Sequence, residues 1–366
     1  MKKRLLMIAT AMMLTVTSLT GCSSLKKDDV VVKVNDTELT AGVANFYARY
    51  MQAMYETYYG AYLGDNMWNT EAEEGKTYEE SVKDSVLEEL ETMLVLEQHM
   101  DEYNVSLSDD DKELIKKTAK EFDEDNSLEN KEKIMADTES LERLLTLLAI
   151  EQKMTDAIEA DADTEVSDDE AAQKSMDYVL FSYTKEDADA SEDEESTEDS
   201  TEMTDDEKAS VRKEAEDFAK AANEDSLKFK ELAEDAEVEV QTVTFDAESE
   251  TPSADLVKTA DQLEKGQVTG VVETEDGCYV ACVTSLMDKD ATESKKAEIV
   301  EERKSDLYDE VTEKWMDDAK IKVYKKVWEK VDFNAVSVTI KQTEQDPYAD
   351  EIQTDDQAEE SDTAEE

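Results

Sequence analysis

Apolar residues recur three or four positions apart over much of the chain, the spacing of amphipathic helices. After Thr77, for example, Val82, Val86, Leu90 and Leu94 fall on one helical face. Four of the predicted helices open on a Ser or Thr followed three residues later by Glu or Asp, the pattern of a capping box. The predicted helices span residues 40–58, 77–100, 108–122, 128–158, 204–222, 254–263 and 291–319, and a short one starts at Ser167.

Shorter runs of β-branched and aromatic residues between these helices predict strands. Asp276 and Gly277 separate two of the runs and predict a hairpin turn. Strands and helices are mixed along the chain, which predicts an α+β fold. The predicted strands are 30–34, 176–183, 238–245, 268–273, 278–285, 321–324 and 336–340.

Charge excludes several functions. The 366 residues contain 98 Asp and Glu against 39 Lys and Arg, a formal charge of −59, so a nucleic-acid partner is not expected. The single histidine, His99, excludes sites that need two histidines, and no calcium-loop or metalloprotease motif occurs. We therefore expect no metal and no cofactor.

Two segments are almost purely acidic. Residues 185–207 hold thirteen acids and one Lys, and residues 341–366 hold eleven acids and one Lys. Such segments bury too little apolar surface to fold, so we expect a disordered loop and a disordered tail.

The first residues predict export. Three basic residues precede an apolar run from Leu5 to Leu19, which is too short to span a membrane. The run ends in Leu19-Thr20-Gly21-Cys22, which resembles the lipobox of bacterial lipoproteins. The resemblance implies a signal peptide over 1–21, a diacylated Cys22 and a lipidated tether over 22–29 on the outer face of the cell membrane. An ordinary secretory signal is the alternative.

Cys278 and Cys282 lie four residues apart in one predicted strand. At about 3.3 Å per residue their Cα atoms are roughly 13 Å apart, too far for a disulfide. We expect buried free thiols on one face of the strand.

Several segments in order resemble extracytoplasmic foldases of the PrsA and SurA type. Residues 31–40 resemble the opening strand and turn of a SurA-like domain, and residues 90–109 its long helix and exit loop. Residues 263–277 resemble a conserved stretch of a parvulin-type prolyl isomerase. The resemblance implies a discontinuous helical chaperone domain, residues 30–170 and 291–340, with a parvulin-like α+β domain inserted at 175–287.

The predicted parvulin-like domain departs from the family at its chemistry. Tyr178 and Tyr279 stand where the resemblance implies two histidines, and they are the candidate catalytic residues. Asp261 stands where it implies a buried Phe. The apolar residues implied for peptide binding here are Leu180, Leu256, Leu263 and Val268.

A second peptide-binding surface is predicted on the helix that follows Thr40. Its stripe of aromatic residues and Met would form a groove for extended apolar segments, although the same stripe could be core. The stripe comprises Phe46, Tyr47, Tyr50, Met51 and Tyr55.

Three functions remain open from the sequence. The first is a lipid-anchored chaperone for unfolded or nascent secreted polypeptides, with a parvulin-like domain that has lost isomerase activity. The second is an active peptidyl-prolyl isomerase that uses the two tyrosines. The third is an acidic structural or cation-buffering lipoprotein. The oligomeric state is not predicted.

Overall fold

The computed structural model describes residues 14–18, 25–64, 66–73, 75–184 and 203–340. The predicted acidic tail and most of the predicted acidic loop lie outside these residues. The chain divides into two compact units: unit 1 comprises Met1–Ala162 and Lys304–Glu366, and unit 2 comprises Asp163–Arg303. One long helix, α11 (Lys289–Asp318), contributes residues to both units. The predicted fold class, an α+β chain with a discontinuous helical domain, is confirmed.

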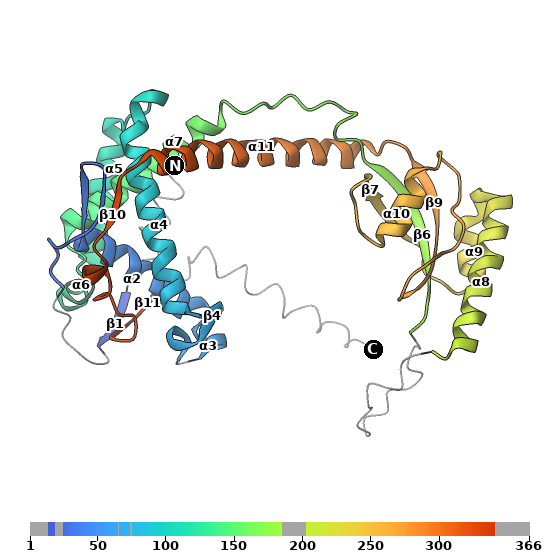
Figure 1. The fold of residues 1–366 in the computed structure, drawn as a ribbon, viewed down its shortest axis with the longest axis horizontal. Coiled ribbons are helices and arrows are strands. Elements are labelled where there is room, and N and C mark those ends of the chain that lie inside the picture. The colour runs from blue at the N-terminus through green and yellow to red at the C-terminus, as the bar shows by residue number, and fades with distance from the viewer. Residues whose placement is uncertain (1–13, 19–24, 65, 74, 185–202, 341–366) are drawn as a thin grey trace, which may run out of the picture. The chain divides into compact units, whose positions relative to one another are not determined.

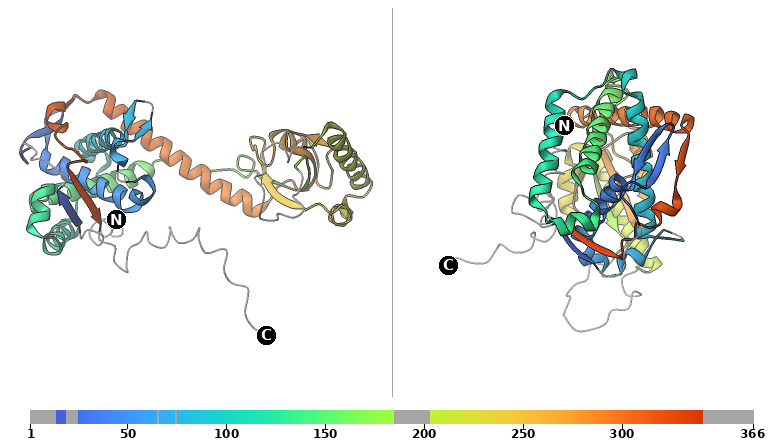
Figure 2. Two further views of the ribbon diagram at one scale, coloured as in Figure 1. Left: turned by 90° about the horizontal axis from the view of Figure 1, so that it is seen from below. Right: turned by 90° about the vertical axis from the view of Figure 1, so that its left-hand side faces the viewer.

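Unit 1 is a bundle of helices beside a small antiparallel sheet (Figure 2). Helix α2 (Ala41–Tyr58) packs against α4 (Tyr78–His99) and α7 (Thr138–Glu159), and α5 (Asp109–Asp125) packs on α7. The sheet has the order β10-β2-β3, so its C-terminal strand β10 (Ile321–Val323) pairs with the N-terminal strand β2 (Val30–Val34). The two ends of the sequence are thus joined in one unit.

The remaining elements of unit 1 are short. They are β1 (Leu14–Ser18), β3 (Thr37–Thr40), α3 (Gly60–Leu63), η1 (Met67–Asn69), β4 (Glu71–Glu73), β5 (Lys76–Thr77), η2 (Met100–Tyr103), α6 (Leu128–Ile134), α12 (Lys325–Trp328) and β11 (Val336–Ile340). Strand β1 lies within the predicted signal peptide and pairs antiparallel with β11. Residues 25–29, predicted as tether, are fixed on unit 1: the amide of Gly42 donates to Lys27 O (2.8 Å), and that of Ala41 to Asp29 O (2.7 Å).

Unit 2 is a four-stranded antiparallel sheet of order β7-β6-β9-β8. Its strands are β6 (Lys174–Ser182), β7 (Gln241–Phe245), β8 (Val272–Glu273) and β9 (Gly277–Ser285). Helices α8 (Asp205–Glu224) and α9 (Phe229–Asp235), together with η4 (Ser226–Lys228), lie on one side of the sheet. Helix α10 (Ala254–Asp261) lies on the other side (Figure 1).

Some boundaries differ from those predicted. The helix expected over 128–158 is two helices, because Met135 adopts a left-handed conformation (φ 58°) that ends α6. Ser167 opens a turn and no helix; its hydroxyl accepts from the amide of Glu170. Residues 205–207, which the predicted acidic loop and the predicted helix 204–222 share, belong to the helix: they are the first turn of α8, where Thr204 and Glu207 form the expected capping box.

The capping box of α5 is tied to α7 by a charge. The amide of Ser108 donates to Asp111 Oδ2 (2.8 Å), and Lys153 Nζ lies 2.8 Å from the same oxygen. Burial raises the pKa of Asp111, but the hydrogen bonds from Lys153 and Ser108 outweigh it and lower that pKa to about 2. Asp111 therefore stabilises the fold while it is ionised.

We expect Asp111→Asn to lower the free energy of unfolding by about 1–2 kcal/mol at neutral pH. The folded pKa lies below the ordinary value of 3.8, so the contribution is complete above that value and disappears as pH falls through about 2. Urea unfolding at several pH values measures this difference. Asp110→Asn removes the same charge from the same turn at a side chain that is exposed, and serves as the control. Equal effects of the two substitutions at neutral pH would contradict the assignment.

Candidate functional site

A cavity of about 530 Å³ lies in unit 2 at the free edge of β6. Strand β7 pairs with β6 only from Lys174 to Tyr178, so the rest of β6 extends beyond its neighbour on that side. The cavity lies beside the first residue of β7, Gln241, and the segment that precedes it. It is lined by Tyr178, Leu180, Phe181, Ser182, Thr184, Met203, Val211, Glu214, Glu237, Val238, Glu239, Gln241 and Tyr279.

The two predicted catalytic tyrosines meet at this cavity. Their ring centroids are 6.0 Å apart because Leu180, two residues after Tyr178 on the same face of β6, pairs directly with Tyr279 of β9. The hydroxyl of Tyr178 donates to Oε1 of Gln241, its cross-strand neighbour on β7. Burial raises the pKa of both tyrosines. Both are therefore neutral phenols at physiological pH, able to hydrogen-bond but not to change charge.

Only some of the predicted peptide-binding residues join the tyrosines. Leu180 lines the cavity, and Leu256 and Leu263 pack on the same side of the sheet. Leu256 belongs to α10 and is fully buried between that helix and the sheet, so a peptide could reach it only if the helix moved. Val268 packs on the opposite side, among residues of α8 and α9, and does not belong to the tyrosine site.

Asp261, the acidic residue in the predicted pocket, forms an ion pair within unit 2. Asp261 accepts from Nζ of Lys174 through both Oδ1 (2.8 Å) and its backbone oxygen (2.6 Å). The ion pair ties the end of α10 to the start of β6. Asp261 is therefore a structural residue of this face.

The turn before β9 requires glycine. Gly277 has φ 149°, and a Cβ there would lie 2.2 Å from the backbone oxygen of Phe181. This close approach lets β9 pair with β6 up to Ser182 and brings Tyr279 against the cavity. The glycine in the predicted motif thus has a steric role.

The sequence did not predict the polar rim of the cavity. Glu214, Glu237 and Glu239 come from α8 and from the segment before β7, and they meet only in the folded unit. Gln241 was also missed, although the register between β6 and β7 would have placed it beside Tyr178. The cavity combines an apolar floor with a negative rim, which suits apolar and basic side chains of an extended chain.

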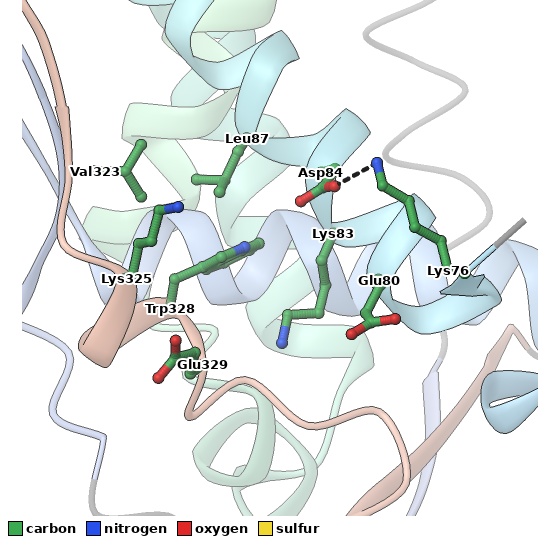
Figure 3. A pocket seen from close by; sticks show the side chains of 10 residues that line it. Lys76, Glu80, Lys83, Asp84, Leu87, Val323, Lys325, Trp328 and Glu329 are labelled. Atoms are coloured by element: carbon green, nitrogen blue, oxygen red, sulfur yellow. Dashed lines mark hydrogen bonds and ion pairs between the residues drawn. The ribbon is translucent and has the colours of Figure 1, made fainter. Parts of the chain in front are cut away.

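A second cavity, of about 590 Å³, lies in unit 1 beside Trp328 (Figure 3). Lys83 lies over the Trp328 ring (5.7 Å from Nζ to the centroid) and donates to Val331 O (2.5 Å). Lys76 pairs with Asp84 (2.8 Å). The charged groups of this cavity are largely engaged with the protein itself.

The aromatic stripe on α2 is divided between core and partly exposed positions. Phe46 and Tyr47 are buried in the unit 1 core, and Phe46 packs edge-on against Phe122 (5.3 Å between centroids). These two residues hold the core together and do not line a groove. Tyr50, Met51 and Tyr55 are half-buried and pack against that core.

Cys278 and Cys282 are free and buried on one face of β9, as expected. The described residues include no group of three or more His, Cys, Asp or Glu placed to hold a metal ion. Among the helices that the structure describes, none has the length and apolar character needed to cross a membrane.

No protein-family model and no curated protein matches the sequence. The fold is similar to that of the foldase protein PrsA from Lactococcus lactis, with 12% identity, a TM-score of 0.34 and coverage of 83% of this chain and 97% of that one. A SurA-like chaperone structure from Campylobacter jejuni gives 12% identity, a TM-score of 0.29 and coverage of 81% and 99%. The structure of the peptidylprolyl isomerase PrsA from Bacillus cereus gives 18% identity, a TM-score of 0.28 and coverage of 73% of this chain and 98% of that one. These structures are of the kind that the sequence resembles; at such identities and TM-scores the likeness does not establish an activity.

The geometry around the two thiols makes a direct prediction. Burial raises the pKa of both Cys278 and Cys282, and Cys278 Sγ lies 3.2 Å from the hydroxyl of Tyr183. In a chain with Cys22→Ser, we expect both thiols to react with Ellman's reagent roughly a hundredfold more slowly in the native state than in urea. Rapid labelling of the native protein at neutral pH would contradict burial of the two thiols.

Proposed function

We propose that this chain is an extracytoplasmic chaperone of the foldase type that binds unfolded secreted polypeptides. In this proposal unit 2 keeps a parvulin-like peptide cavity but does not catalyse prolyl isomerisation. The binding part rests on the cavity at the edge of β6, which combines apolar and negative side chains. The loss of isomerase activity rests on the two positions where the resemblance implies imidazoles: they hold neutral phenols, one of which is engaged by Gln241.

Catalysis of prolyl isomerisation would require this site to stabilise the transition state of peptide-bond rotation. Rotation about a peptide bond crosses a barrier of about 18–20 kcal/mol, and the enzyme must stabilise a twisted amide with fixed dipoles in a dry pocket. The hydroxyl hydrogen of Tyr178 is already committed to Gln241. The apolar side chain of Leu256, on α10, is fully buried against the sheet. The remaining cavity can hold a peptide but offers little to a twisted amide.

Binding of a peptide does not require stabilisation of a twisted amide; it requires apolar surface, complementary charge and free backbone groups. Leu180, Val211 and Val238 supply apolar surface, and Glu214, Glu237 and Glu239 supply negative charge. The edge of β6 beyond Tyr178 has no partner from β7, so a backbone could pair there. We expect extended client segments with apolar and basic side chains to bind best, and acidic segments to be disfavoured by the charge of the chain.

An active isomerase is the second candidate. It is favoured by one observation, the 6.0 Å separation of the Tyr178 and Tyr279 rings at a shared cavity. A tyrosine hydroxyl both donates and accepts, so a pair of them could replace imidazoles in a hydrogen-bonded cluster.

The location of the chain is also part of the proposal. The lipobox-like sequence before Cys22 supports lipidation at that residue and a position on the outer face of the cell membrane. Leu25 is buried in unit 1, so only two residues lie between the anchor and the folded unit. Unit 1 would then be held close to the bilayer surface.

The central test is NMR exchange spectroscopy on an Ala-Pro peptide, together with suppression of aggregation of an unfolded secreted protein. The protein is residues 22–366 with Cys22→Ser. We expect suppression of aggregation and no acceleration of cis–trans exchange. Acceleration that disappears in Tyr178→Phe/Tyr279→Phe, but not in the exposed control Tyr62→Phe, would instead establish the isomerase.

Lipidation is tested separately. In bacterial cells that export the chain, we expect the wild type in the membrane fraction and Cys22→Ser in the soluble extracytoplasmic fraction, because loss of the thiol removes the acyl chains. Ser23→Ala leaves the thiol in place and is the control. Membrane association of Cys22→Ser equal to that of wild type would contradict the anchor.

A further inference from the structure

Strand β11 has two edges, and side chains of helix α2 form hydrogen bonds with the backbone groups of one of them. Glu56 Oε2 accepts from the amide of Val338 (2.8 Å), and Thr57 Oγ1 accepts from the amide of Ile340 (2.8 Å). Gln52 Nε2 donates to Val336 O (2.6 Å). Side chains of α2 therefore satisfy the backbone groups of alternate residues along β11.

The other edge of β11 pairs with β1, which lies in the predicted signal peptide (called the leader below). Backbone groups of successive residues in a strand point to opposite sides, so those of Ser337 and Thr339 face β1. The register pairs Thr17 with Ser337, Val16 with Val338 and Thr15 with Thr339. Val16 is buried against the unit 1 core, at 6% exposure, while Thr15 and Thr17 are exposed.

Processing at Cys22 would remove β1 and leave this edge open. Two amide hydrogens and two carbonyl oxygens, those of Ser337 and Thr339, would then lack strand partners beside the space that Val16 fills. Open strand edges of this kind pair readily with other extended chains.

We propose that β11 is a strand-addition site for an extended segment of unfolded polypeptide, and that residues 14–18 fill it in the unprocessed chain. This inference rests on the proposed chaperone function and names a second client site for it, in unit 1. The segment has a β-branched apolar side chain at its centre, because the place of Val16 is apolar, and the two flanking side chains face solvent, as Thr15 and Thr17 do.

The surroundings favour a single strand over a second copy of the protein. Helix α6 contacts β1, so the place of β1 lies between β11 and α6. A second copy that offered its own β11 would bring its α2 and α6 along, and these would compete for the same space. An extended client segment carries no such bulk.

The probe is a fluorescent peptide of residues 13–19, titrated by anisotropy into two forms of the protein: the full chain, and residues 22–366 with Cys22→Ser. Val16 is the only leader residue in the described core, so the shorter chain keeps its fold, which circular dichroism checks. We expect the peptide to bind the full chain at least about tenfold more weakly, because the tethered leader competes at high effective concentration.

A matched pair of modified peptides separates strand addition from non-specific sticking. Methylation of the Thr17 amide removes a hydrogen that points at β11, whereas methylation of the Val16 amide removes one that points away. We expect the first peptide to bind the shorter chain at least about tenfold more weakly than the unmodified probe, and the second to bind within about threefold of it.

Equal binding to both protein forms, or equal loss with both methylated peptides, would overturn the inference. Dimerisation of the shorter chain that the peptide does not displace would also overturn it, in favour of a second copy. If the shorter chain suppresses aggregation but does not bind the probe, the strand site fails and the chaperone function stands. If it binds the probe as expected but suppresses no aggregation, the strand site stands and the chaperone function fails.

Discussion

The carboxylate of Glu56 joins the two ends of the sequence, and the rest of unit 1 depends on that junction. Its Oε1 accepts from Gln52 Nε2 (2.6 Å) and Trp68 Nε1 (2.9 Å), and its Oε2 accepts from Ser337 Oγ (2.6 Å) and the amide of Val338 (2.8 Å). Hydrogen bonds to a charged group contribute about 1.5–3 kcal/mol each, more than neutral ones. A single side chain on α2 thus fixes the orientation of β11, more than 280 positions away in sequence.

Neighbouring residues reinforce the same junction. Arg49 donates to Gln52 Oε1 (2.6 Å) and Asp332 O (3.0 Å), and burial lowers its pKa to about 10. Phe333 is fully buried and packs edge-on against Trp68. A polar cluster beside aromatic rings holds the returning chain, so α2 fixes the position of β11, whose other edge pairs with β1. A discontinuous domain needs such a closure, because its two halves are separated by an inserted unit.

Local signals predicted much of the fold. The capping boxes at Thr77, Ser108 and Thr204 are all present, and each marks the first turn of its helix. The resemblance implied that Tyr178 and Tyr279 share one site, and the register of β6 with β9 brings them together. Long-range features could not be predicted from the sequence. Helical spacing cannot distinguish a groove from a core, so the sequence left both open for Phe46 and Tyr47, which the structure buries.

The two candidate binding places depend on contacts that sequence patterns do not encode. The glutamate rim in unit 2 forms only when the segment before β7 lies near α8. Strand β1 lies in an apolar run that indicates a signal peptide, and nothing local in it predicts pairing with residues 336–340. In the proposals above, both places share one physical feature, a strand edge beside apolar surface: β6 extends beyond β7, and β11 would lose its partner if β1 were removed. Pairing at such an edge uses backbone groups and depends little on the sequence of the added chain.

Hydrogen exchange followed by mass spectrometry, on residues 22–366 with and without a reduced, unfolded secreted protein, tests this account most directly. The account predicts that the client slows exchange at residues 180–184 and 336–340 while the buried helix 78–99 stays unchanged. Unchanged exchange at both edges, in the presence of a client that binds, would contradict it.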